Sequence, residues 1–119
     1  MKRNWDTIRE ILLRAEALES DTTLRLSDFD ENRSDEIAYH VKLLKEAELI
    51  QVSIAEFLGG AGIHFDLERL TWSGHEFLDA IRNVTIWDKT KATIAEKGGT
   101  MTFELVKSVA IKLATALVL

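Results

Sequence analysis

The side chains with the most evident potential for chemistry lie in an acidic run in the first third of the chain. Four oxygen-bearing residues alternate with other types there, as in the first half of a calcium loop: Asp28, Asp30, Asn32 and Ser34. Such a loop needs glycine at its sixth position and a bidentate glutamate at its twelfth. Arg33 and Tyr39 stand at those positions, so a cation would meet a positive charge and lack a ligand. An acidic loop with a helix cap at Asn32 or Ser34 explains the run better.

A second candidate for metal chemistry is the pair His75-Glu76, followed by Asp79. A zinc-protease helix has a second histidine where Asp79 stands, and His40 and His64 show no ligand spacing with this pair. The chain also lacks a Gly-x-Ser-x-Gly elbow and a glycine loop ending in Gly-Lys-Ser or Gly-Lys-Thr. We therefore expect no metal, no cofactor and no enzymatic activity.

The remaining chemistry is nucleic-acid binding, for which Ser34–Ala47 is the candidate recognition helix. The residues predicted to meet duplex DNA are Ser34, Tyr39, Lys42 and Lys45 on this helix, with Lys89 and Lys91 on backbone phosphates. Against this prediction, Ser34–Leu49 contains two lysines, four acids and no arginine for bidentate guanine contact. The alternative is that this face docks a protein partner, and that Lys89 and Lys91 belong to an ordinary solvated helix surface.

A helix, a hairpin and a second helix must position these residues. Apolar residues at helical spacing predict the first helix over Ser34–Ala47. Two alternating runs, Leu49–Phe57 and Ile63–Glu68, flank the glycine-rich tip Gly59–Gly62 and predict a β-hairpin whose tip has no basic residue. Thr71 suits the N-cap of the closing helix, and Gly74 inside that helix suggests a close approach by another main chain.

Further elements complete the expected core. An N-terminal helix begins after Asn4 as its N-cap, and Leu24–Leu26 is expected as a short edge strand beside the hairpin. Part of Ser27–Asp35 is expected to form the short second helix of a helix-turn-helix. The predicted fold class is α+β: a winged helix-turn-helix-like domain with three N-terminal helices, a β-hairpin wing and a short edge strand, followed by C-terminal helices.

The C-terminal third is expected to be helical. Trp87–Glu96 predicts one helix, broken at Gly98-Gly99, and Thr102 can cap another. The last helix carries an apolar stripe of Phe103, Val106, Val109, Ala110, Leu113 and Leu117. Because surplus apolar surface must be buried, this stripe predicts a homodimer interface. The alternative is that the helix folds back over the first helix of its own chain.

Length and composition set the frame for these expectations. The 119 residues suit one globular unit, with a core over 1–83 and a helical extension over 84–119. Cysteine is absent, which excludes disulfides and thiolate zinc sites. Charges interrupt the apolar runs, which argues against a signal peptide or a membrane span and favours a cytoplasmic protein. The net charge is −5, and the excess of basic residues is confined to Val84–Leu119, with five against three acids, which counts against simple DNA binding.

Three blocks of the sequence resemble a family of small hypothetical proteins of bacteria and their phages, classed as a domain of unknown function. The blocks are Met1–Leu12, Tyr39–Leu44 with Leu49-Ile50, and Leu70–Arg82, followed by Trp87 with its lysines. The resemblance implies a winged-helix-like fold and a prophage background, and it implies no activity. Two hypotheses follow: a small dimeric DNA-binding regulator of prophage type, and a winged-helix protein-interaction module that binds no nucleic acid.

Overall fold

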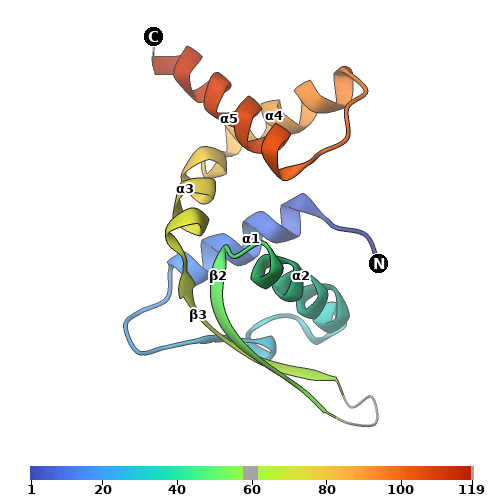
Figure 1. The fold of residues 1–119 in the computed structure, drawn as a ribbon, viewed down its shortest axis with the longest axis vertical. Coiled ribbons are helices and arrows are strands. Elements are labelled where there is room, and N and C mark those ends of the chain that lie inside the picture. The colour runs from blue at the N-terminus through green and yellow to red at the C-terminus, as the bar shows by residue number, and fades with distance from the viewer. Residues whose placement is uncertain (58–61, 119) are drawn as a thin grey trace. The chain divides into compact units, whose positions relative to one another are not determined.

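The computed structural model describes residues 1–57 and 62–118, the last two by their main chain alone. The chain divides into two compact units, Met1–His75 and Glu76–Leu119, called the N-terminal and C-terminal units below (Figure 1). The division falls within helix α3 (Trp72–Ile81), whereas the sequence led us to expect a boundary after residue 83. Helices combine with an antiparallel sheet, so the fold class is α+β, as expected.

Two helices lie side by side in the N-terminal unit (Figure 1). Helix α1 (Trp5–Glu16) begins where predicted, because the Asn4 side chain accepts hydrogen bonds from the amides of Asp6 and Thr7. Helix α2 (Ser34–Glu46) ends one residue before the predicted limit. The apolar faces of the two helices are buried: Trp5, Ile8, Ile11, Leu12 and Ala15 on α1, and Ile37, Val41 and Leu44 on α2.

The segment between these helices, which the structure describes without a gap, differs from the prediction. Two three-residue 3-10 helices, η1 (Leu26–Asp28) and η2 (Glu31–Arg33), replace the expected second α-helix. The Asp28 carboxylate accepts a hydrogen bond from the Arg25 amide at 2.8 Å, and Asp30 accepts one from the Asn32 amide at 2.9 Å. Local bonds of this kind compete with helix formation. The acidic run therefore caps tight turns, and neither Asn32 nor Ser34 caps α2.

A three-stranded antiparallel sheet of order β1-β3-β2 completes the N-terminal unit. β2 (Ile50–Glu56) and β3 (Ile63–Leu70) form the predicted hairpin, with a bulge between Gln51 and Val52. β1 (Leu24–Arg25) is the predicted edge strand, paired with Leu67 and Asp66 of β3, and it is one residue shorter than expected because Leu26 begins η1. Of the glycine-rich tip, Gly62 is described, and residues 59–61 lie outside the described residues.

The start of α3 is fastened to the chain that enters β2. The Thr71 hydroxyl accepts a hydrogen bond from the Gly74 amide at 3.1 Å and donates one to the Glu48 carbonyl at 2.7 Å. The Thr71 amide donates to the Leu49 carbonyl at 3.0 Å, and a Cβ built on Gly74 would lie 2.0 Å from that same oxygen. The N-cap at Thr71 and the close approach at Gly74 are therefore confirmed.

Two helices packed against each other make up most of the C-terminal unit, α4 (Val84–Glu96) and α5 (Phe103–Val118). α4 begins before the predicted Trp87, because the Asn83 side chain accepts a hydrogen bond from the Ile86 amide. The break at Gly98, with φ +69°, and the cap of α5 by Thr102 are confirmed. In the parts of the chain that the structure describes, no helix is long and apolar enough to cross a bilayer.

Candidate functional site

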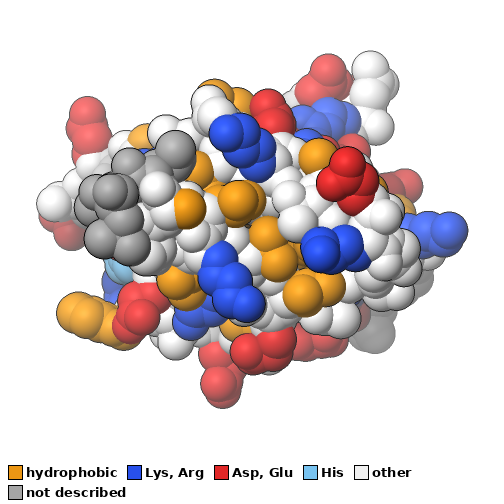
Figure 2. Space-filling view, turned by 90° about the horizontal axis from the view of Figure 1, so that it is seen from above, with side chains coloured by type: hydrophobic (Ala, Val, Ile, Leu, Met, Phe, Trp, Pro, Cys, Tyr) orange, Lys and Arg blue, Asp and Glu red, His pale blue; other side chains and the backbone are white. Residues whose placement is uncertain are grey.

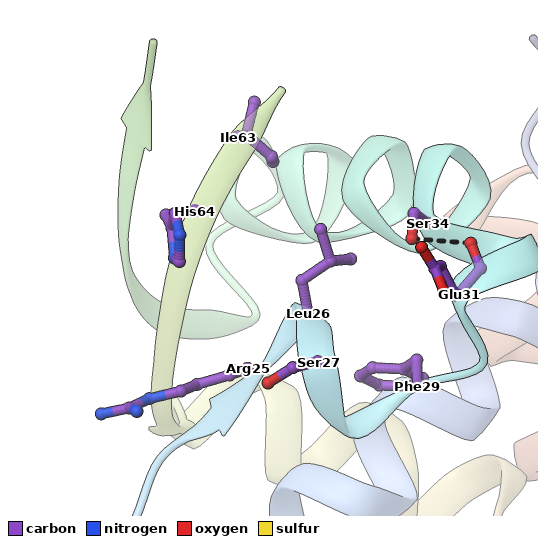
Figure 3. Close-up of a pocket in the computed structure, with 8 residues that line it drawn as sticks. All are labelled: Arg25, Leu26, Ser27, Phe29, Glu31, Ser34, Ile63 and His64. Carbon is purple, nitrogen blue, oxygen red and sulfur yellow. Dashed lines mark hydrogen bonds between the residues drawn. The ribbon is translucent and has the colours of Figure 1, made fainter. Parts of the chain in front are cut away.

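A groove runs along the N-terminal half of α2, between that helix, η1 and the end of β3 nearest the hairpin tip. It consists of two adjoining hollows of about 460 and 510 Å³, which share Leu26, Ser34 and Ile63 in their walls. In Figure 3, Leu26 extends from η1 into the hollow, with Ile63 above it on β3 and Phe29 beside it. Below, "the groove" means these two hollows.

An ion-pair cluster holds the start of α2 against α1. Arg33, just before α2, donates hydrogen bonds of 2.8 and 2.9 Å to Glu10 of α1 and of 2.8 and 3.2 Å to Glu36 of α2. The Thr7 hydroxyl donates to the same Glu36 carboxylate at 2.5 Å. These bonds, from Arg33 first and Thr7 second, lower the pKa of Glu36 to about 2, and the two carboxylates raise the pKa of Arg33. The cluster fixes the first turn of α2, which forms one wall of the groove.

His40 fastens the N-terminal segment to the same helix. Its side chain is buried, and its Nε2 accepts a hydrogen bond from the Asn4 amide at 2.7 Å. The proton therefore resides on Nδ1, which lies 2.7 Å from the Glu36 carbonyl and donates to it. Both ring nitrogens are engaged by main-chain groups, so this histidine serves the fold. The available sequence signal was its spacing of three from Ile37 and four from Leu44, on the buried face of the helix.

The four residues of α2 predicted to meet DNA follow the groove and the helix surface beyond it. Ser34, Tyr39 and Lys42 line the hollow of about 510 Å³, and Lys45 lies one turn further along. The Ser34 hydroxyl donates to the Glu31 carbonyl at 2.8 Å, and Lys42 forms an ion pair with Glu56 of β2. Lys45 is exposed and has no ion-pair partner among the described residues. Thus only one of the two lysines has its charge free.

The other two predicted DNA contacts belong to α4, in the C-terminal unit. Lys89 is exposed there, while Lys91 lies 3.9 Å from the carboxylate of Asp88 and 5.4 Å from the ring centre of Trp87. On the face drawn in Figure 2, basic, acidic and apolar side chains are interspersed. Among the described residues on that face, positive charge forms no single block of the kind that nucleic-acid binding uses.

Most side chains of the stripe predicted as a dimer interface are already buried or half-buried in the folded chain. Val106 and Ala110 are fully buried, Val109 and Leu113 are half-buried, and the Phe103 ring lies 4.7 Å from that of Phe77. The side chain of Leu117 lies outside the described residues. Val106 and Ala110 have no surface left for a second chain, and a dimer through this helix stays a prediction.

The comparisons with known proteins identify the family. Residues 2–100 match a family described as hypothetical protein (DUF2513). The chain belongs to this family. An uncharacterized protein of Haemophilus influenzae (strain ATCC 51907 / DSM 11121 / KW20 / Rd) is 41% identical over 111 residues, which cover 92% of each chain. No solved structure matches the chain. The predicted resemblance to an uncharacterised bacterial family is thus confirmed, and the phage background stays a prediction.

In this DUF2513 protein, the unpaired charged side chains that line the groove are carboxylates. Between residues 1 and 75 there are nine lysines and arginines against fifteen aspartates and glutamates. The arginine and the lysine that line the groove are each paired with an acid, Arg25 with Asp66 at 3.0 Å and Lys42 with Glu56. Glu31 and Asp35 also line it, are exposed, and have no ion-pair partner among the described residues. A side chain placed in the groove would therefore meet apolar surface and unpaired carboxylates.

Proposed function

We propose that residues 1–75 of this DUF2513 protein form a winged-helix-like module that binds a partner protein through the groove beside α2, and that binds no nucleic acid. The order of elements supports the winged-helix part: α1, the edge strand β1, α2, then the β2–β3 hairpin, with a strand order of β1-β3-β2. In that architecture α2 takes the place of the recognition helix. No catalytic step belongs to the proposal.

The observation that carries the proposal is the charge at the start of α2. In helix-turn-helix proteins the N-terminal residues of the recognition helix contact base edges. Here the first turn contains Asp35 and Glu36, and Glu31 lies just before it. Lys42, on the same helix, is already paired with Glu56. Phosphates brought to this face would meet carboxylates rather than free cations, which removes the main source of affinity for duplex DNA.

Duplex DNA is the second candidate ligand, in a dimeric regulator of prophage type. The observation that favours it is the exposed Lys45, whose ammonium group has no ion-pair partner among the described residues. Lys89 on α4 would add a phosphate contact. This candidate requires affinity from few cations, so its binding would be weak and sensitive to salt.

A titration with random-sequence duplex at low and at physiological salt separates the two candidates. The proposal expects no binding to duplex even at low salt. Binding that weakens steeply as salt rises would overturn it, because that dependence reports the release of counterions from phosphates. Lys45→Ala and Lys89→Ala are the matched variants. Loss of duplex binding in Lys45→Ala would locate the contact on α2, and loss of duplex binding in Lys89→Ala would locate it on α4.

A further inference from the structure

We infer that the groove takes an extended segment of a partner protein, with an apolar side chain beside Leu26 and Ile63 and a lysine or arginine beside Glu31 or Asp35. This inference rests on the proposed function and specifies the chemistry of the partner. Three independent features of the groove support it: its apolar floor, its unpaired carboxylates and an open edge of β3.

The floor of the groove is apolar and accessible. Leu26 and Ile63 are half-buried, and they face each other across the hollow in Figure 3. Phe29 is buried, and the guanidinium of Arg14 lies 4.2 Å from the centre of its ring. The aromatic ring is thereby held in place as one end of the floor. An apolar side chain placed here would remove the remaining exposed surface of Leu26 and Ile63 from water.

The unpaired carboxylates of Glu31 and Asp35, which form the rim of the groove, select the charge of the ligand. Glu31 and Asp35 are exposed and have no ion-pair partner among the described residues, whereas Arg25 and Lys42 are held by Asp66 and Glu56. A cation on the ligand would gain an unpaired carboxylate in either hollow, Glu31 in one and Asp35 in the other, whereas an anion would meet cations that are already paired. Complementary charge of this kind governs which partner is accepted.

The edge of β3 favours an extended ligand over a helical one. β1 pairs with β3 only at Leu67 and Asp66, so β3 continues toward Ile63 beyond the end of β1. The Phe57 amide donates to the Gly62 carbonyl at 3.2 Å, which turns the main-chain groups of Gly62 toward β2. Because these groups alternate along a strand, those of Ile63 face the opposite edge, on the side of the groove. A strand added there would extend the sheet, a common mode of peptide recognition.

The test is selection of random dodecapeptides displayed on phage against the immobilised full chain, followed by anisotropy titration of the selected peptides. The inference expects peptides that combine apolar residues with lysine or arginine. Their binding should weaken about tenfold or more in Glu31→Lys or in Asp35→Lys, because each places like charges together. Glu96→Lys, an exposed reversal on α4, is the matched control and should leave the affinity unchanged.

Two results would overturn the inference: no enrichment at all, or selected peptides whose affinity is the same for the wild type and both rim variants. Leu26→Ser provides a second test that does not depend on charge, and it should weaken the same peptides. Failure of the proposed function would be seen separately, as salt-sensitive binding to duplex DNA. Loss of peptide binding in either rim variant, with no duplex binding, supports the inference and the proposed function together.

Discussion

At the scale of the residue, the charges beside the groove serve the placement of α2. Arg33 joins Glu10 of α1 to Glu36 of α2, and Thr7 adds a hydrogen bond to the same carboxylate. Because the cluster lies at the start of α2, it holds this wall of the groove in place. Under the proposed function, binding would then cost less entropy, since the site would need little ordering.

The ion-pair cluster of Arg33, Glu10 and Glu36 predicts how the stability of the fold changes as the pH falls. The folded-state pKa of Glu36, about 2, lies below its ordinary value, so its contribution to stability is present above about pH 4.5 and lost as the pH falls toward 2. Glu36→Gln should therefore lower the urea midpoint at pH 7, and the difference from wild type should shrink steadily toward pH 2. Tryptophan fluorescence during urea unfolding measures the midpoint.

Asp35→Asn is the matched control, because Asp35 is exposed beside Glu36 and has no ion-pair partner among the described residues. Its midpoint should follow the wild type at every pH. A constant difference between Glu36→Gln and wild type from pH 7 to pH 2 would show that the charge of Glu36 does not act through Arg33.

Single-residue roles were the least predictable part of the site. The sequence indicated that Tyr39, Lys42 and Lys45 lie on one helix, and the structure places them there. Nothing in the sequence indicated that Lys42 pairs with Glu56, or that Arg33 pairs with Glu10, since each pair joins separate elements. Such pairings depend on the tertiary fold, and spacing along one helix cannot report them.

At the scale of the element, the regular patterns predicted the structure well. Alternation predicted β2 and β3, and the short run at Leu24 predicted the edge strand. The prediction failed between residues 26 and 33, where apolar periodicity is absent and side chains bond the local main chain. Local hydrogen bonds of Asp28 and Asp30 decided the 3-10 turns, and hydrophobic patterning cannot detect them.

The junction of β2 and α3 gives a test at this scale. Gly74→Ala should destabilise the protein by about 3 kcal/mol or more, because the new Cβ would lie 2.0 Å from the fixed carbonyl of Leu49. This cost exceeds the gain in helix propensity of about 1 kcal/mol. Gly99→Ala is the matched control, since its Cβ would meet no atom closer than 3.5 Å. Urea unfolding of both variants measures the difference, and equal stabilities would refute the close approach.

At the scale of the whole molecule, the two units differ in charge and in what the sequence revealed of them. The N-terminal unit has an excess of acids, whereas residues 76–119 have six lysines and arginines against five acids. The sequence predicted the apolar stripe of α5 and left its partner open between a second copy of the chain and the first helix, because amphipathic spacing shows that a face is buried and does not show against which element. The structure places α4 against α5, which accounts for the burial of Val106 and Ala110.

The last prediction separates packing within the chain from a dimer. Val106 is fully buried, so Val106→Ala should cost about 2 kcal/mol through lost burial and the cavity left behind. Hydrogen exchange should then be about tenfold faster or more in α4 and α5, with no change of mass in sedimentation. Ile111→Ala is the control, since Ile111 is 46% exposed and its truncation should leave both readouts nearly unchanged. A lower sedimenting mass for Val106→Ala, with exchange unaltered, would instead place Val106 between two chains.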